Sequence, residues 1–296
     1  MRQPHTLAGS LLTLAALACF ATLDTSAKVV ALTLPVLLGL WFRYVFQAVI
    51  TTAAMLPRRG RALFRTQRLG AQLLRGVLLA VTSLLTFLSV KYMPVGEFTA
   101  IAMVTPLVVT LLAATVLGEH VSRRRWWLVA GGFVGTLIII RPGGALFGWA
   151  TLLPLAQVAS YSAFQILTSR LVQTEDAVTM HVYTGWVGTV LASLALPFIW
   201  VMPQTATEWT ALTLMGLMGT VGHFLLILAY RRAPAASLAP LMYAQIAFAT
   251  LAGWLVFAHV PDGWSLLGMA LIAACGAASA WLAVLESRVK LEPLEV

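Results

Sequence analysis

An arginine lies deep inside a long apolar stretch of the chain. Arg43 is about nine residues into the apolar run 34–56, which as a helix would place it roughly 14 Å from the end of the run. A charge at that depth in hydrocarbon costs about 2.5 kcal/mol or more, so Arg43 must face protein or water. Its planar guanidinium suits a carboxylate. Arg43 therefore either binds an anionic group of a substrate or holds helices together through a buried ion pair.

An aspartate and a lysine share one face of the first apolar run. Asp24 and Lys28 are four residues apart, so as helical residues they can pair with each other near the end of the run. We expect Lys28 to extend its ammonium group toward the membrane surface. Asp24 has three further possible roles: a pair with Arg43 on the neighbouring helix, a contact with substrate, or the uptake of a proton in an exchange cycle.

Three polar side chains follow one another at steps of four residues in the run 147–169. Gln157, Tyr161 and Gln165 would form a polar stripe along an otherwise apolar helix. Such a stripe must avoid lipid, so it lines a cavity or forms hydrogen bonds to another helix, and its regular spacing favours the cavity. Tyr161 would offer both an aromatic face and a hydroxyl group.

Prolines interrupt two of the apolar runs at comparable places. Pro106 lies in the run 96–117 and Pro240 in the run 237–257, where Tyr243 and Gln245 follow. Each proline removes one backbone hydrogen bond of a helix. A single proline could merely kink its helix for packing. Breaks in corresponding helices of two halves instead mark a binding site near the middle of the membrane, so Tyr243 and Gln245 are candidate cavity residues.

The histidines and cysteines give weaker signals. His223 follows Gly222 in one apolar run and His181 begins another, and a lone membrane histidine is more often a packing partner than a ligand. His223 is the better candidate for the cavity. The spacing typical of a metal site is absent from the sequence, so we expect no metal and no cofactor. Cys19 and Cys275 are expected to be buried thiols and not a disulfide.

The composition of the chain indicates what kind of secondary structure holds these residues in place. The chain has 296 residues, of which 60% are hydrophobic and 10% charged, and its mean hydropathy is +0.90. A soluble surface needs roughly 25% charged residues. The sequence therefore predicts an integral membrane protein whose apolar runs are helices.

Ten runs are long enough to cross about 30 Å of hydrocarbon as helices. They cover approximately residues 7–28, 34–56, 72–92, 96–117, 126–141, 147–169, 180–202, 207–230, 237–257 and 264–285. The first run lacks a small-residue cleavage site, so we expect it to be a retained helix and not a signal peptide. The predicted fold class is an all-α integral membrane protein with ten transmembrane helices.

The basic residues predict an orientation in the membrane. With the N-terminus in the cytoplasm, fifteen of the nineteen Lys and Arg residues fall on the cytoplasmic side, Arg75 among them. Lys28, Lys91 and Arg141 fall outside. This asymmetry follows the positive-inside rule and predicts that both termini are cytoplasmic. The high pI then reflects topology, and no binding of nucleic acid is expected.

Two halves of five helices echo each other, with residues 1–142 as the first repeat and 143–296 as the second. Phe20 and Asp24 correspond to Tyr161 and Gln165 at an offset of about 141 residues. Because five is odd, the second half must enter from the opposite side of the membrane, so the repeats are inverted. Inverted repeats place a binding site between the halves and permit alternating access, as in a secondary carrier.

Several short motifs follow one another along the chain in an order that is typical of one family. They are Phe42-Arg43, Ala100 through Pro106 to Gly118-Glu119, Arg141-Pro142-Gly143, Gly222-His223, Ala229-Tyr230-Arg231-Arg232-Ala233-Pro234, and Leu238-Ala239-Pro240 with Tyr243 and Gln245. Over nearly its whole length the chain resembles the EamA branch, with ten helices, of the drug/metabolite transporter superfamily. One departure is Ala258-His259 where the resemblance implies Gly-Glu, which makes a transport role for Glu119 doubtful.

The resemblance implies a multi-pass protein of the bacterial inner membrane whose partners are the lipid bilayer and a small-molecule substrate. It implies export of an amino acid or a derivative, with opine-type metallophores among the candidates, and not catalysis. The alternative is uptake of a vitamin or nucleoside-like metabolite such as riboflavin or S-adenosylmethionine. Small residues in the last helix of each half allow close packing, and in the family these helices lie outside the pore, where a homodimer could form.

Overall fold

The described part of the chain is helical. The computed structural model describes residues 4–116, 122–141, 148–171, 174–232 and 238–289, and these residues form helices and no strands. Glu119 lies outside the described residues. The helices of the first half are α1 (Pro4–Thr33), α2 (Val36–Arg59), the 3₁₀ turn η1 (Gly60–Phe64), α3 (Leu69–Tyr92), α4 (Val95–Ala102), α5 (Thr105–Val116) and α6 (Arg123–Ile140).

The second half follows the same pattern. Its helices are η2 (Trp149–Thr151), α7 (Leu152–Leu171), α8 (Ala177–Ile199), α9 (Ala206–Arg232), η3 (Ala239–Tyr243), α11 (Ala244–Phe257) and α12 (Gly263–Val289). Helices occupy all ten predicted runs, and among the described residues seven helical stretches are long and apolar enough to cross a membrane. The prediction of an all-α membrane protein is confirmed at this level. The count of ten crossings and the side of each terminus stay predictions.

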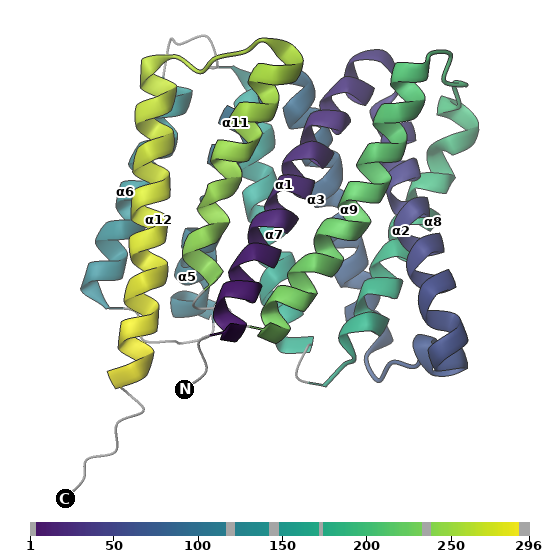
Figure 1. Cartoon of the computed structure of the whole chain (residues 1–296), viewed down its shortest axis with the longest axis horizontal. Helices are drawn as coiled ribbons and strands as arrows, with labels where there is room; N and C mark the ends of the chain where they lie inside the picture. The colour runs from purple at the N-terminus through teal and green to yellow at the C-terminus, as the bar shows by residue number, and fades with distance from the viewer. Residues whose placement is uncertain (1–3, 117–121, 142–147, 172–173, 233–237, 290–296) are drawn as a thin grey trace, which may run out of the picture.

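The helices form two layers that exchange one member (Figure 1). Helix α1, from the first half, packs between α9 and α11 of the second half, and α7, from the second half, packs beside α3 and α5 of the first half. This reciprocal exchange is what two inverted halves would produce. It brings residues of both halves to the space between the layers.

The two layers are joined at both edges of the bundle. At one edge α6 packs on α12, where a Cβ atom on Gly135 would lie 2.9 Å from the carbonyl oxygen of Gly268. At the other edge α2 packs on α8, where a Cβ atom on Gly188 would lie 2.3 Å from Cδ1 of Tyr44. Such close approaches need glycine because any side chain would collide with the neighbouring helix. The small residues of α6 and α12 thus serve packing within one chain.

Both predicted proline breaks are present. A turn at Met103 and Val104 separates α4 from α5, and Pro106 is the second residue of α5, where its missing N–H costs no helical hydrogen bond. Pro240 is likewise the second residue of η3, which leads directly into α11. Each break redirects a helix close to the space between the layers.

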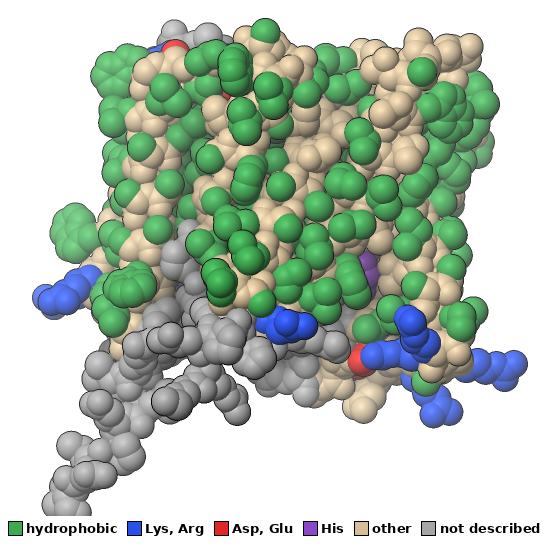
Figure 2. Space-filling model, viewed as in Figure 1, with side chains coloured by type: hydrophobic (Ala, Val, Ile, Leu, Met, Phe, Trp, Pro, Cys, Tyr) green, Lys and Arg blue, Asp and Glu red, His purple; other side chains and the backbone are tan. Residues whose placement is uncertain are grey.

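One end of the bundle is rich in arginine. Helix α1 begins and α12 ends at the lower end in Figure 1. Figure 2 shows Lys and Arg side chains gathered along this edge. Arg58 and Arg59 close α2 here, and Arg123 begins α6. We call this the basic end and the opposite one, which holds Lys28 and Arg141, the far end.

Candidate functional site

Arg43 projects from α2 into the bundle, where it meets neutral partners. Its Nη1 donates a hydrogen bond to Oγ of Ser83 on α3, and its guanidinium lies 5.1 Å from the centre of the Tyr44 ring. The Tyr44 hydroxyl lies 2.9 Å from the same Ser83 oxygen. Arg43 is buried, and its Nε has no hydrogen-bond partner. The ion pairs of the described residues do not include Arg43, and its hydrogen bond goes to a neutral group.

Asp24 faces this arginine from α1. Its buried carboxyl group interacts with the side chain of Gln245 on α11 and lies within electrostatic range of Arg43. Lys28 turns elsewhere and donates hydrogen bonds to the carbonyl oxygens of Val90 and Met93 at 2.8 and 2.7 Å. The predicted pair between Asp24 and Lys28 does not form, because the last carbonyl groups of α3 lack helical partners and attract the ammonium group.

Two histidines that are distant in sequence form a pair. The ring centres of His181 on α8 and His223 on α9 are 5.9 Å apart, and Phe20 of α1 meets His223 edge to face at 4.9 Å. His223 donates a hydrogen bond from Nδ1 to the carbonyl oxygen of Gly219 at 2.7 Å, and Gln47 donates from Nε2 to Nδ1 of His181 at 3.3 Å. The sequence presents both as lone histidines, because nothing in their spacing connects α8 with α9.

Arg75 is a second buried arginine, which the sequence pattern counts only among the basic residues of the cytoplasmic side. It lies within α3, which begins at Leu69, and it is 8% exposed. Its Nη1 donates to the carbonyl oxygen of Met180 at 2.9 Å and to Oγ1 of Thr184 at 2.7 Å. Its Nε donates to Oγ1 of Thr168 at 2.8 Å. The signal that could have revealed it is its position inside the predicted run 72–92.

The polar stripe on α7 contributes one residue to this region. Tyr161 stacks on Phe164 with ring centres 5.7 Å apart, and the Arg75 guanidinium lies 4.7 Å from the centre of Phe164 and within electrostatic range of Tyr161. Gln157 is buried with no partner for its Oε1, and Gln165 is half-buried. A cavity role for these two glutamines stays a prediction.

Tyr243 lies apart from these residues, in contrast to its predicted place in the cavity. A Cβ atom on Gly276 of α12 would lie 1.9 Å from Cζ of Tyr243, so the tyrosine ring packs on α12. The reason is helical geometry: Tyr243 precedes Gln245 by two residues, which places the two side chains on nearly opposite sides of the helix. Only Gln245 therefore faces Asp24.

These side chains form what we call the central polar cluster. Its members are Asp24, Arg43, Arg75, Tyr161, His181, His223 and Gln245. The two arginines lie within electrostatic range of both histidines. The cluster thus holds two guanidinium groups and a single carboxyl group, and that carboxyl group lies within electrostatic range of Arg43. Across the described residues, no three His, Cys, Asp or Glu side chains converge as metal ligands do.

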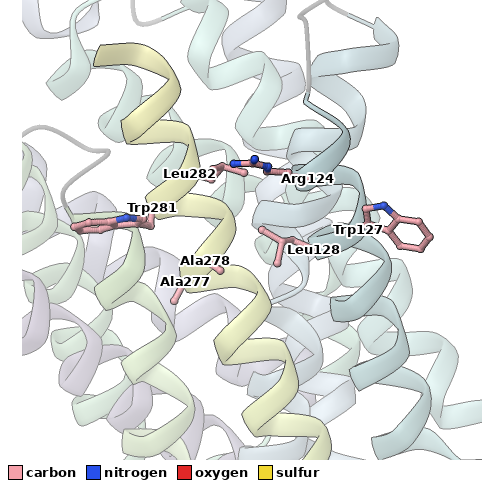
Figure 3. Close-up of a pocket in the computed structure, with 7 residues that line it drawn as sticks. All are labelled: Arg124, Trp127, Leu128, Ala277, Ala278, Trp281 and Leu282. Carbon is pink, nitrogen blue, oxygen red and sulfur yellow. The ribbon is translucent and has the colours of Figure 1, made fainter. Parts of the chain in front are cut away.

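A groove on the outer edge of the bundle is unsuited to a polar ligand. It lies between α6 and α12 and is lined mainly by apolar side chains, with Arg124 at one end (Figure 3). Trp127 and Trp281 point away from each other on either side of the two helices. The buried arginines Arg43 and Arg75 lie elsewhere, in the central polar cluster.

Comparison with known proteins agrees with this architecture. The sequence model of the EamA-like transporter family matches residues 7–141 and 148–279. A riboflavin transporter of Vibrio cholerae is 31% identical over 90% of this chain and 91% of its own length. The pseudopaline exporter CntI of Pseudomonas aeruginosa is 28% identical over 89% of this chain and 93% of its own length.

A solved structure shares the fold, with a TM-score of 0.66 and 21% identity over 96% of this chain and 99% of that one. The named relatives are transporters of small metabolites and not enzymes. Both halves of the bundle are covered by the family match. The chain is a member of the EamA-like transporter family, within the drug/metabolite transporter superfamily.

Proposed function

We propose that this protein is a secondary carrier of the bacterial inner membrane, with its basic end in the cytoplasm. The two inverted halves, residues 1–142 and 143–296, would expose the central polar cluster alternately to the two sides. The observation that carries this proposal is the burial of Arg43 and Arg75 between the layers, where their hydrogen bonds go to neutral groups and a single carboxyl group, that of Asp24, lies within electrostatic range of Arg43.

An anionic group on the substrate follows from this arrangement. A buried charge without a partner costs several kcal/mol, and an anion arriving between the arginines would offset part of that cost. The rings of Phe20, Tyr161 and Phe164 provide apolar faces beside the charges. A zwitterion or an acid with an apolar or planar body suits this combination better than a sugar phosphate, which would need more cations.

Export is the direction we propose. The substrate would be an amino acid or a compound derived from one, with opine-type metallophores among the candidates. The relative that is named as a pseudopaline exporter supports this direction. Asp24 would discriminate among such compounds, because a carboxyl group beside Arg43 offers a partner for the ammonium group of a zwitterion.

A second candidate is uptake of a vitamin or nucleoside-like metabolite such as riboflavin or S-adenosylmethionine. The observation that favours it is the relative named as a riboflavin transporter, which matches over nine tenths of both chains. The clustered aromatic and imidazole rings would also suit a planar heterocycle.

The test is a comparison of metabolites inside and outside cells. Untargeted mass spectrometry would be applied to cells and medium for bacteria producing the wild type, Arg43→Gln, Arg61→Gln or no carrier. Arg61 is exposed in η1 and serves as the matched control. A metabolite enriched in the medium with wild type and Arg61→Gln only would establish export. Depletion of riboflavin from the medium by the same two proteins would establish the uptake candidate.

A further inference from the structure

A buried glutamate at the far end has no role in the central polar cluster. Glu97 lies in the first turn of α4, and its side chain is 3% exposed. Its Oε1 accepts a hydrogen bond from Nε2 of His259 at 2.9 Å. Its Oε2 is buried and has no partner. One oxygen of this carboxylate is therefore bound, while the other is available to a proton.

A lysine completes the surroundings of this carboxylate. The Lys28 ammonium group lies within electrostatic range of Glu97 and 5.4 Å from the centre of the Phe257 ring. The same group holds the end of α3 through the Val90 and Met93 carbonyl oxygens. Ends of α1, α3, α4 and α11 thus meet around one negative charge.

The other charged groups of the helices packed on α4 have partners elsewhere. Arg141, at the end of α6, forms an ion pair with Asp262, which precedes α12. Lys91 of α3 lies 5.9 Å from the ring centre of Tyr92. Asp24 is one helical turn from Lys28 and belongs to the central polar cluster. Lys28 and His259 are accordingly the groups that face Glu97.

The pair of Glu97 and His259 joins the two halves of the protein. Glu97 belongs to the first half, and His259 follows α11 of the second. Close packing of α4 on α11 reinforces the junction, since a Cβ atom on Gly96 would lie 2.9 Å from Oγ1 of Thr250. Any opening of the far end between these helices must break the bond from His259 to Glu97.

We propose that Glu97 and His259 form a proton-binding latch that closes the far end and opens when Glu97 takes up a proton from that side. The proton would bind the free Oε2 of Glu97 and remove the negative charge. The Lys28 ammonium group, which lies within electrostatic range of Glu97, would then no longer be balanced by that charge. Loss of the latch permits α4 and α11 to separate.

The latch would supply the coupling that a secondary carrier needs. This role in coupling rests on the proposed function. A proton entering from the far end would open that end for release of an exported substrate. The direction of proton movement would then oppose that of the substrate. His259 thereby acquires a role at the position where the chain departs from the Gly-Glu that the family resemblance implies.

The latch can be tested without any substrate, by measuring the reactivity of a cysteine beneath it. Thr25 is buried on α1, one turn below Lys28, and its hydroxyl has no partner. In a background with Cys19→Ala and Cys275→Ala, Thr25→Cys would be labelled with a membrane-impermeant maleimide in proteoliposomes. The same labelling of Val260→Cys, at a residue that is 65% exposed, measures how the ionisation of an accessible thiol changes with pH. The labelling of Thr25→Cys is divided by that of Val260→Cys.

We expect the corrected labelling of Thr25→Cys to rise about tenfold as the pH falls from about 8 to about 5, which corresponds to roughly 1.4 kcal/mol. In Glu97→Gln, labelling should be high at both values, because the amide, like the protonated acid, carries no negative charge. His259→Ala should also raise labelling at pH 8, and it provides the test if Glu97→Gln does not fold.

Asp262→Asn is the matched control, because it removes an exposed ion pair that also joins the halves. Its labelling profile should match that of the wild type. Labelling that does not change with pH in the wild type, or a wild-type profile in Glu97→Gln, would overturn the latch. Because the labelling needs no substrate, failure of the latch is distinguishable from failure of the proposed transport function.

Discussion

Arg43 of α2 donates a hydrogen bond to Ser83 of α3, and this contact fixes the direction of a buried guanidinium group. Tyr44, the next residue, reaches the same serine oxygen at 2.9 Å. Two neighbouring residues of one helix thus converge on one hydroxyl of another. The arrangement leaves Nε of Arg43 without a partner in a buried position, which is where a substrate anion would be stabilised most.

Replacing Ser83 by alanine should disturb Arg43 without removing its charge. The lost hydrogen bond leaves a buried charged group less satisfied, which costs about 1.5–3 kcal/mol. We expect a lower midpoint of thermal unfolding in detergent for Ser83→Ala. Ser89→Ala is the control, because Ser89 is also buried on α3 but bonds only to the carbonyl oxygen of Leu85 in its own helix. Equal midpoints for the two variants would show that Ser83 does not hold Arg43.

Arg75→Gln should remove most transport of the metabolite identified by mass spectrometry. Loss of a charge-assisted contact of about 1.5–3 kcal/mol predicts a reduction of about tenfold or more in the initial rate. Arg61→Gln should keep the wild-type rate. The measurement is the initial rate of flux into or out of proteoliposomes containing equal amounts of folded carrier. A wild-type rate in Arg75→Gln would confine this arginine to a packing role.

Gly135→Leu should destabilise the edge formed by α6 and α12. A Cβ atom at this position would lie 2.8 Å from Cγ1 of Ile272, so the helices must move apart, at a cost of about 1–3 kcal/mol. Gly253→Ala is the contrasting variant, because no atom lies within 4 Å of its Cβ position. Removing a glycine from the interior of α11 should stabilise it by about 0.5–1 kcal/mol. Opposite shifts of the unfolding midpoint in detergent are expected; the same shift for both would contradict this packing.

Acid should loosen the loop before α3 at the basic end. Glu175 accepts hydrogen bonds from Thr66 and from the backbone N–H groups of Gln67 and Arg68. Burial acts to raise the pKa of Glu175, but these bonds and one from Gln72 outweigh it and hold the pKa below its ordinary value. A lowered pKa stabilises the fold above the pKa of the unfolded chain, about 4.3, and this stability is lost as the pH falls through the lower folded value.

The unfolding midpoints of wild type and Glu175→Gln test this pH dependence. The wild type should be the more stable protein at pH 7, and the difference should shrink as the pH falls through the lowered pKa of Glu175 in the folded protein. A difference that persists at low pH would assign the effect to packing and not to the charge.

Hydropathy alone was sufficient to predict the helices. Each of the ten predicted runs is occupied by helix, and Pro106 and Pro240 mark real breaks, because the membrane imposes helix length and proline cannot donate a backbone hydrogen bond. Arg43 is conspicuous in the sequence because its charge stands among apolar neighbours. Arg75 is less conspicuous, since it stands near the start of its run, only seven residues after Arg68.

Other features of the site depend on tertiary structure that sequence spacing does not encode. His181 and His223 meet because α8 and α9 lie across the two layers, and Glu97 meets His259 from the other half of the chain. Tyr243 packs on α12 and not beside Gln245, because side chains two residues apart in a helix lie on nearly opposite sides. Lys28 binds helix-end carbonyls that no pattern along α1 reveals.

The measurement that tests the central claim most directly is the chemical class of the metabolite that only the functional carrier moves. Mass spectrometry of cells and medium should find a compound with at least one carboxylate or other anionic group, moved by wild type and Arg61→Gln. Both Arg43→Gln and Arg75→Gln should lose it while remaining folded. A neutral or purely cationic compound, moved equally well by Arg43→Gln and Arg75→Gln, would contradict the account.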